Sequence, residues 1–159
     1  MAAKSYTREI IVSNTPGAAY RALTSEFDKW WTPGSGSLAA IDDTVTIKFE
    51  PTHWTLRATK LVPDVYVELE CVGAHHILEG LPESILKEWQ GTKLKWQIQQ
   101  QGEKTKIILV HKGLIPSLGC YDVCEAGWDH FFVNSLKAYL DAGEGNPYWP
   151  FTKAKIFKK

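Results

Sequence analysis

The sequence contains few cysteines and no long apolar run, and each shortage excludes a class of protein. Three cysteines among 159 residues are too few, and odd in number, for a disulfide framework. No apolar run of about eighteen residues occurs, so no membrane-spanning helix is predicted. The N-terminal MAAKSYTREI lacks the apolar centre of a signal peptide. We therefore expect a cytoplasmic protein with free thiols.

A surplus of charge and a metal-binding pattern are also missing. Lys plus Arg and Asp plus Glu number 18 each, so the formal net charge is zero. A general nucleic-acid-binding protein carries an excess of positive charge, and this chain has none. Cys120 and Cys124 have a C-x3-C spacing, but no second pair with zinc-like spacing occurs. We expect no metal, no other cofactor, no nucleic-acid partner and no integral membrane association.

Aromatic residues are abundant instead. The chain has seven Trp, six Tyr and six Phe residues, a content that suits a large packed core or a lined cavity. A length of 159 residues favours one domain, residues 1–159, with a sizeable core. No internal repeat, low-complexity segment or linker divides it.

The longest helical pattern runs from Tyr121 to Ala142. Asp122 fits the N-cap position, and Glu125 follows three residues later, which is the spacing of a capping box. Gly143 follows the last periodic residue and predicts the end of the helix. The face expected to be buried is unusually aromatic and includes one hydroxyl. Its members are Trp128, Phe132, Ser135, Leu136 and Tyr139.

A β-rich stretch precedes this helix. Alternating strands of this kind form an antiparallel sheet with one wet face, and only the last helix is long enough to cover the dry face. The pattern therefore predicts an α+β fold in which a curved sheet wraps around one long helix. The elements expected are a strand at 6–12, short helices at 17–23 and 25–31 with Ser25 as a cap, strands at 44–49, 54–59, 65–71, 94–99 and 106–110, and a loop or helical turn at 77–90.

Three segments resemble a known family. TREIIVSNTPGAAYRALTSEFDKWW resembles the opening strand and paired helices of the SRPBCC or START-like superfamily, and WQGTKLKWQIQQQGEKTKIILVHKGL looks like its last two strands. CYDVCEAGWDHFFVNSLKAYLDAGEGNP is similar to the C-terminal helix in the branch named after the activator of the heat-shock chaperone ATPase. The resemblance implies a helix-grip fold with a cavity between sheet and helix. It implies no single activity, because the superfamily includes lipid carriers, hormone receptors and polyketide cyclases.

The resemblance and the aromatic helix face together predict a ligand-binding cavity. Ordinary core packing is the alternative for any one of its residues. In the middle of the aromatic face, the Ser135 hydroxyl needs a hydrogen bond to the backbone four residues back, to a ligand or to water. The side chains expected to line the cavity are Trp54, Leu69, His75, Trp96, Leu109, His111, Trp128, Phe132, Ser135 and Tyr139.

His75 and His111 are the two titratable candidates on the strands. By strict alternation, His75 shares a face with Leu69 and Cys71, and His111 shares one with Leu109. Two inward imidazoles could orient a polar ligand group or act as acid and base near pH 7. The alternative, which we favour, is that each lies at a strand end, where alternation fails and the sheet rim is wet.

Four further features each have a structural and a functional interpretation. Asp129 lies on the shoulder of the aromatic face and needs an Arg or Lys partner if it is enclosed. Gly127 costs the helix about 1 kcal/mol relative to Ala, for which close approach of a neighbouring element is the simple reason. Cys124 lies near the helix N-terminus, but a buried inert thiol is the preferred interpretation. The basic tail Phe151–Lys159 could dock on an anionic surface or form a free chain end.

The leading functional prediction is a non-enzymatic module that binds a small hydrophobic molecule, either lipid-like or aromatic. One alternative is a co-chaperone-like module that binds a protein partner and stimulates a chaperone ATPase. Another is a cyclase-like or hydrolase-like enzyme that uses His75, His111 or Asp129. No Ser-His-Asp order, phosphate-binding glycine loop or metalloprotease helix motif points to a different chemistry.

Overall fold

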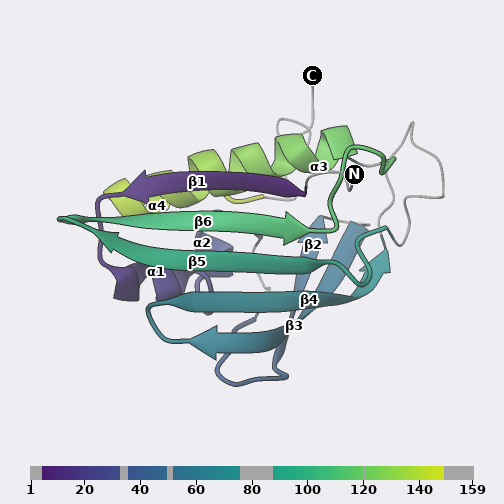
Figure 1. The fold of residues 1–159 in the computed structure, drawn as a ribbon, viewed down its shortest axis with the longest axis horizontal. Coiled ribbons are helices and arrows are strands. Elements are labelled where there is room, and N and C mark those ends of the chain that lie inside the picture. The colour runs from purple at the N-terminus through teal and green to yellow at the C-terminus, as the bar shows by residue number, and fades with distance from the viewer. Residues whose placement is uncertain (1–4, 33–35, 50–51, 76–87, 120, 149–159) are drawn as a thin grey trace.

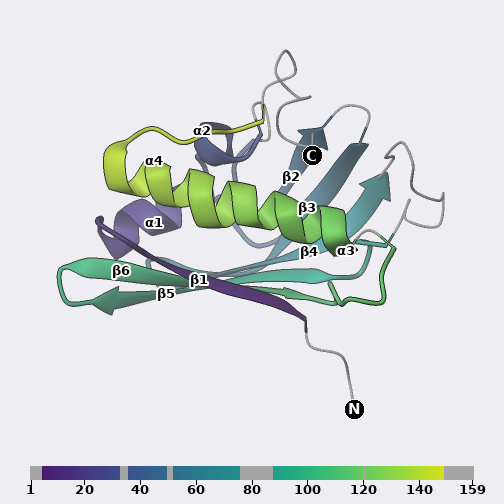
Figure 2. The same cartoon turned by 90° about the horizontal axis from the view of Figure 1, so that it is seen from above.

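A computed structural model of the protein describes residues 5–32, 36–49, 52–75, 88–119 and 121–148. Within them, an antiparallel sheet of six strands in the order β1-β6-β5-β4-β3-β2 curves around a long C-terminal helix (Figures 1 and 2). This arrangement confirms the predicted α+β helix-grip fold. The strands are β1 (Tyr6–Val12), β2 (Thr44–Phe49), β3 (Thr52–Val62), β4 (Tyr66–His75), β5 (Lys93–Gln101) and β6 (Lys104–Lys112).

Two short helices, α1 (Pro16–Ala22) and α2 (Phe27–Trp30), follow β1. Thr15 caps α1, because its hydroxyl oxygen accepts a hydrogen bond from the Ala18 amide at 3.1 Å. Ser25 does not cap α2 as predicted. Its hydroxyl donates instead to the Arg21 carbonyl at 3.2 Å, at the end of α1.

The long helix has the predicted bounds but an unexpected middle. It consists of α3 (Tyr121–Trp128), a π-helical segment η2 (Asp129–Leu136) and α4 (Lys137–Ala142). Gly143 ends it in the left-handed conformation, with a φ of 83°. Asp122 lies in the first turn rather than at the N-cap. In the first turn its negative charge still interacts favourably with the helix dipole. The π-helical segment carries Ser135 and two buried Phe residues, and such segments frequently mark functional sites.

Polar contacts tie the long helix to the edge strand β1. The Tyr6 hydroxyl donates to the Asp129 carboxylate at 2.8 Å. Arg8 forms ion pairs with Asp129 at 3.1 Å and with Glu125 at 3.0 Å. Asp129 is therefore a half-exposed anchor between helix and sheet, with the Arg partner that its position calls for.

A tight turn joins β5 and β6. Gln101 pairs with Lys104, so the loop consists of Gly102 and Glu103. Gly102 has a φ of 63°, a conformation that glycine adopts without strain. Within the described ranges, no helix combines the length and the apolar character that crossing a lipid bilayer requires.

Candidate ligand-binding interior

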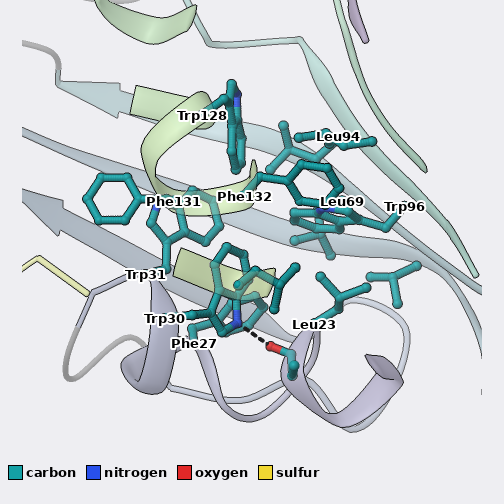
Figure 3. Packing of buried hydrophobic residues seen from close by; sticks show 14 of the residues in the cluster. Leu23, Phe27, Trp30, Trp31, Leu69, Leu94, Trp96, Trp128, Phe131 and Phe132 are labelled. Atoms are coloured by element: carbon teal, nitrogen blue, oxygen red, sulfur yellow. Dashed lines mark hydrogen bonds between the residues drawn. The ribbon is translucent and has the colours of Figure 1, made fainter. Parts of the chain in front are cut away.

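Four tryptophans meet between the sheet and the long helix, and we call them the indole cluster: Trp30, Trp31, Trp96 and Trp128 (Figure 3). Trp30 and Trp31 stack with ring centroids 5.3 Å apart. Trp31 also contacts Trp128 on the helix, at 4.9 Å. Trp96 of β5 stands edge-on to Trp30 and Trp31, at 6.5 and 6.3 Å. Because aromatic pairs add about 0.5–1.5 kcal/mol beyond their burial, these contacts hold α2, the helix and the sheet together.

A second ring group, the Phe49 cluster, comprises Phe49, Trp54, Trp89, Phe131 and Tyr148. Trp54 and Trp89 stack with centroids 4.1 Å apart. Phe49 contacts Tyr148 at 4.9 Å and Phe131 at 5.4 Å. This cluster joins strands β2 and β3 to the long helix and to the chain that follows it.

His111 lies between the two clusters and is fully buried. Its Nδ1 accepts a hydrogen bond from the Trp128 indole N–H at 3.0 Å. The Thr92 hydroxyl donates to the Trp89 carbonyl at 2.6 Å and lies 2.9 Å from His111 Nε2. This pattern assigns the proton to Nε2, which donates to Thr92. The imidazole is thus neutral, and each of its nitrogens has a partner.

Burial lowers the pKa of His111 to about 3. At neutral pH it is therefore a structural hydrogen-bonding group and is poorly suited to act as an acid or base. The inward orientation predicted from strand alternation is confirmed for His111. Its favoured placement at the wet rim is wrong.

His75 lies on the outer face of the sheet, as the favoured alternative expected. A register shift leaves Val72 as an extra residue, because Leu56 pairs with Cys71 and Thr55 pairs with Gly73. One extra residue reverses the alternation beyond it. His75 consequently pairs with His53 and stacks on its ring, with centroids 5.0 Å apart. Strict alternation, which placed His75 with Leu69 and Cys71, was wrong because it could not include this bulge.

Ser135 is buried and takes both of its partners from elsewhere in the chain. Its hydroxyl donates to the Trp30 carbonyl at 2.8 Å and accepts from the Asn146 amide at 2.7 Å. It therefore bonds neither to the backbone four residues back nor to a ligand. Asn146 belongs to residues 143–148, which we call the strap, a segment that runs back along the helix.

Tyr139 lies at the edge of the interior. It is half-buried, and its hydroxyl donates to the Glu26 carboxylate at 2.9 Å. Burial and this hydrogen bond raise the pKa of Tyr139 to about 12. Its polar end faces the outer rim beside α2 rather than the ring clusters.

The other predicted residues all lie in one buried core. Their side chains are at most 6% exposed, and they come from β3, β4, β5, β6 and the long helix: Trp54, Leu69, Trp96, Leu109, Trp128 and Phe132. The indole N–H of Trp96 is buried and has no hydrogen-bond partner among the described residues.

Several interior residues were absent from the predicted set. Trp30 and Trp31 were expected on a short helix, and two adjacent tryptophans at its end were a usable signal. Trp89 fell in the predicted loop at 77–90, of which 77–87 lie outside the described residues. Tyr148 follows the helix stop, and no periodicity marked it as buried. Only the course of the chain after Gly143 brings it inside.

The remaining sequence features have simple structural outcomes. Apart from the helix's own backbone, a Cβ on Gly127 would meet no atom of the described residues within 4 Å, so the expected close approach of a described strand or short helix is wrong. Cys124 is buried, and its sulfur accepts from the Trp89 indole at 3.2 Å. Cys120 and the tail from Phe151 lie outside the described residues. Among the residues that are described, no three His, Cys, Asp or Glu side chains converge as metal ligands.

No protein-family model and no curated protein matches the chain. Solved structures do. The chain is 25% identical to the Aha1 dimer from Colwellia psychrerythraea, over 91% of this chain and 100% of that chain, with a TM-score of 0.72. DynU16, from the dynemicin biosynthetic locus, is 12% identical over 91% of this chain and 49% of its own, with a TM-score of 0.67. CV1439 from Chromobacterium violaceum is 15% identical over 87% and 98%, with a TM-score of 0.64.

Proposed function

We propose that this chain, which has the helix-grip fold of the SRPBCC or START-like superfamily and resembles its Aha1 branch, binds a small aromatic molecule between sheet and long helix. The observation that carries the proposal is the Trp96 indole N–H. It is fully buried among aromatic rings, and no described group accepts its hydrogen bond. A buried donor left without an acceptor costs about 1–3 kcal/mol, which a ligand with one acceptor atom would recover.

Three other polar groups of the interior are already hydrogen-bonded within the protein. Both ring nitrogens of His111 have protein partners, and Ser135 uses its hydroxyl proton and one lone pair. The Trp128 N–H is held by His111. A matching ligand is therefore mainly apolar and carries one acceptor.

The packing of the clusters bears on the shape of the ligand. Ring centroids within the two clusters lie between 4.1 and 6.5 Å apart, so rings contact rings across this part of the interior. A compact aromatic molecule can take the place of one ring, whereas a long acyl chain would separate many of these contacts. We therefore favour an aromatic ligand over a lipid.

The test uses a pair of probes that differ in the acceptor. Acetophenone carries a carbonyl oxygen, and ethylbenzene has a similar shape without it. We expect acetophenone to bind the protein about tenfold more tightly in calorimetric titration, because only its carbonyl accepts from Trp96. In W96F this preference should disappear, since Phe has no N–H. Absence of binding by both probes, or an unchanged preference in W96F, would refute the proposal.

A second candidate is binding of a protein partner through the exterior of the domain. The observation that favours it is the 25% identity to the Aha1 dimer along the whole of that chain. Two measurements test it: sedimentation velocity at micromolar concentration, for association with a second copy, and stimulation of a heat-shock chaperone ATPase. A monomer that leaves the ATPase rate unchanged would remove this candidate.

A further inference from the structure

We infer that the strap is a displaceable gate of the proposed aromatic site, and that its Tyr148 fills a place that the ring of a ligand can take. The inference rests on the proposed function and adds the route of entry. It starts from the course of the chain after α4. Gly143 turns the backbone, and residues 143–148 run back past α2 (Figure 2).

The strap fits closely against both helices at Gly145. A Cβ at this position would lie 2.6 Å from the Lys29 carbonyl oxygen and 3.1 Å from the Ser135 carbonyl oxygen. Both atoms belong to backbone, so neither can move aside as a flexible side chain would. Only glycine lets the strap lie in this seam between α2 and the long helix.

Three polar contacts to described residues involve the strap backbone. The Asn146 amide donates to Ser135, and the Tyr148 amide donates to the Trp31 carbonyl, both at 2.7 Å. His130 Nε2 lies 3.1 Å from the Asn146 carbonyl. Within the segment, only Tyr148 is buried, with 2% of its surface exposed. A segment whose other residues are exposed or half-exposed opens at lower free energy than the central strands of a sheet.

Tyr148 occupies a ring-lined place. Its ring stands edge-on to Phe49 at 4.9 Å, and Phe49 in turn contacts Trp54 and Phe131. Its backbone amide is bonded to Trp31, whose ring lies 6.3 Å from that of Trp96. Departure of Tyr148 therefore leaves a space the size of one phenol ring, against Phe49 and next to the backbone of Trp31. None of the strand pairings of the sheet has to break.

The chain offers a variant that opens the strap without removing any core side chain. G145A places a methyl group against the Lys29 carbonyl and should drive the strap out of the seam. The backbone at Gly145 is not left-handed, so the backbone conformation itself does not exclude Ala, and the contact of the added methyl group is the only cause of the change. G127A is the matched control, since it adds the same methyl group to the long helix where nothing lies within 4 Å.

The experiment measures association of acetophenone by stopped-flow quenching of tryptophan fluorescence. We expect G145A to bind about tenfold faster than the wild-type protein, because a larger fraction is open, and G127A to match the wild type. Hydrogen exchange on wild-type protein saturated with acetophenone supplies a readout that needs no variant. The amides of Asn146 and Tyr148 should exchange faster than in the free protein, while those of β5 and β6 should not.

The outcomes separate the two proposals. Equal association rates for G145A and wild type, with the Asn146 and Tyr148 amides still protected at saturation, would overturn the gate and leave the aromatic site intact. Absence of binding to the wild type and to both variants would overturn the site itself, and the gate with it.

Discussion

Acidification should destabilise this protein through His111. The imidazole is fully buried and neutral, and burial lowers its pKa from 6.5 to about 3. Because the folded state disfavours the charged form, the contribution of His111 is fully present above pH 6.5 and is lost as the pH falls toward 3. Each pH unit below 6.5 removes about 1.4 kcal/mol, so the loss at pH 4.5 is about 2.7 kcal/mol. That is a large part of a typical free energy of unfolding of about 5–15 kcal/mol.

The structure also indicates which contact is lost first when His111 is protonated. A proton on Nδ1 would face the Trp128 indole N–H, so two donors would meet 3.0 Å apart. The bond between β6 and the long helix would break at that point, next to Trp89 and its partner Cys124. Near-ultraviolet circular dichroism, which reports the packing of indole rings, should therefore change before the far-ultraviolet signal of the sheet.

The assay compares urea unfolding of wild type and H111N at pH 7.5 and pH 4.5. Asn keeps an acceptor near the position of Nδ1 and cannot be protonated in this range. H111N should be less stable than the wild type at pH 7.5, because Thr92 loses its bond to His111. On acidification to pH 4.5, the free energy of unfolding of H111N should fall by about 2–3 kcal/mol less than that of the wild type. The pKa values of Glu68 and Asp141 are also lowered, by hydrogen bonds and nearby lysines. Their stabilising contributions are lost at lower pH in both proteins and cancel. Equal losses in wild type and H111N would refute the role of His111.

Three further predictions concern single side chains, each measured by urea unfolding at pH 7.5. S135A should lose about 2 kcal/mol, because the buried Trp30 carbonyl and the Asn146 amide both lose their partner. The exposed S25A should change by less than about 0.5 kcal/mol, and similar losses in the two variants would mean that the Ser135 hydrogen bonds carry no stability. G127A should gain about 1 kcal/mol from helix propensity alone, and a loss would reveal a contact that the geometry does not show. W128F should be less stable than W96F by about 1–3 kcal/mol. W128F leaves His111 without its donor, whereas W96F removes an N–H that has no acceptor in the described part of the chain. The reverse order would contradict the assignment of these two N–H groups.

Local sequence signals predicted the elements well where the physics is local. Gly143 correctly predicted the end of the long helix. Alternation gave the correct inner face for Leu109 and His111, because a regular strand repeats every two residues. The same rule failed for His75, since one extra residue at Val72 depends on how β3 and β4 pair and not on either strand alone.

In the candidate site, too, sequence periodicity predicted some features and not others. Trp128 and Phe132 could be assigned to the interior from helix periodicity, and Trp96 from strand periodicity, because each pattern marks a buried face. The partners of Ser135 could not be inferred, as they come from Trp30 and Asn146 on separate segments. The neutral state of His111 likewise depends on Thr92 and Trp128, which approach it only in the folded chain.

By itself, then, the order of residues determined the succession of strands and helices and the aromatic character of the buried layer. Both follow from short-range periodicity and from turn residues such as Gly102 and Gly143. The tertiary structure alone decided how His111 and Ser135 are hydrogen-bonded in that layer, and that the Trp96 N–H has no acceptor among the described residues. It also decided that the chain after Gly143 folds back to bury Tyr148. Hydrogen bonding between distant segments and a return of the chain leave no periodic trace in a sequence, because they depend on where whole elements meet in space.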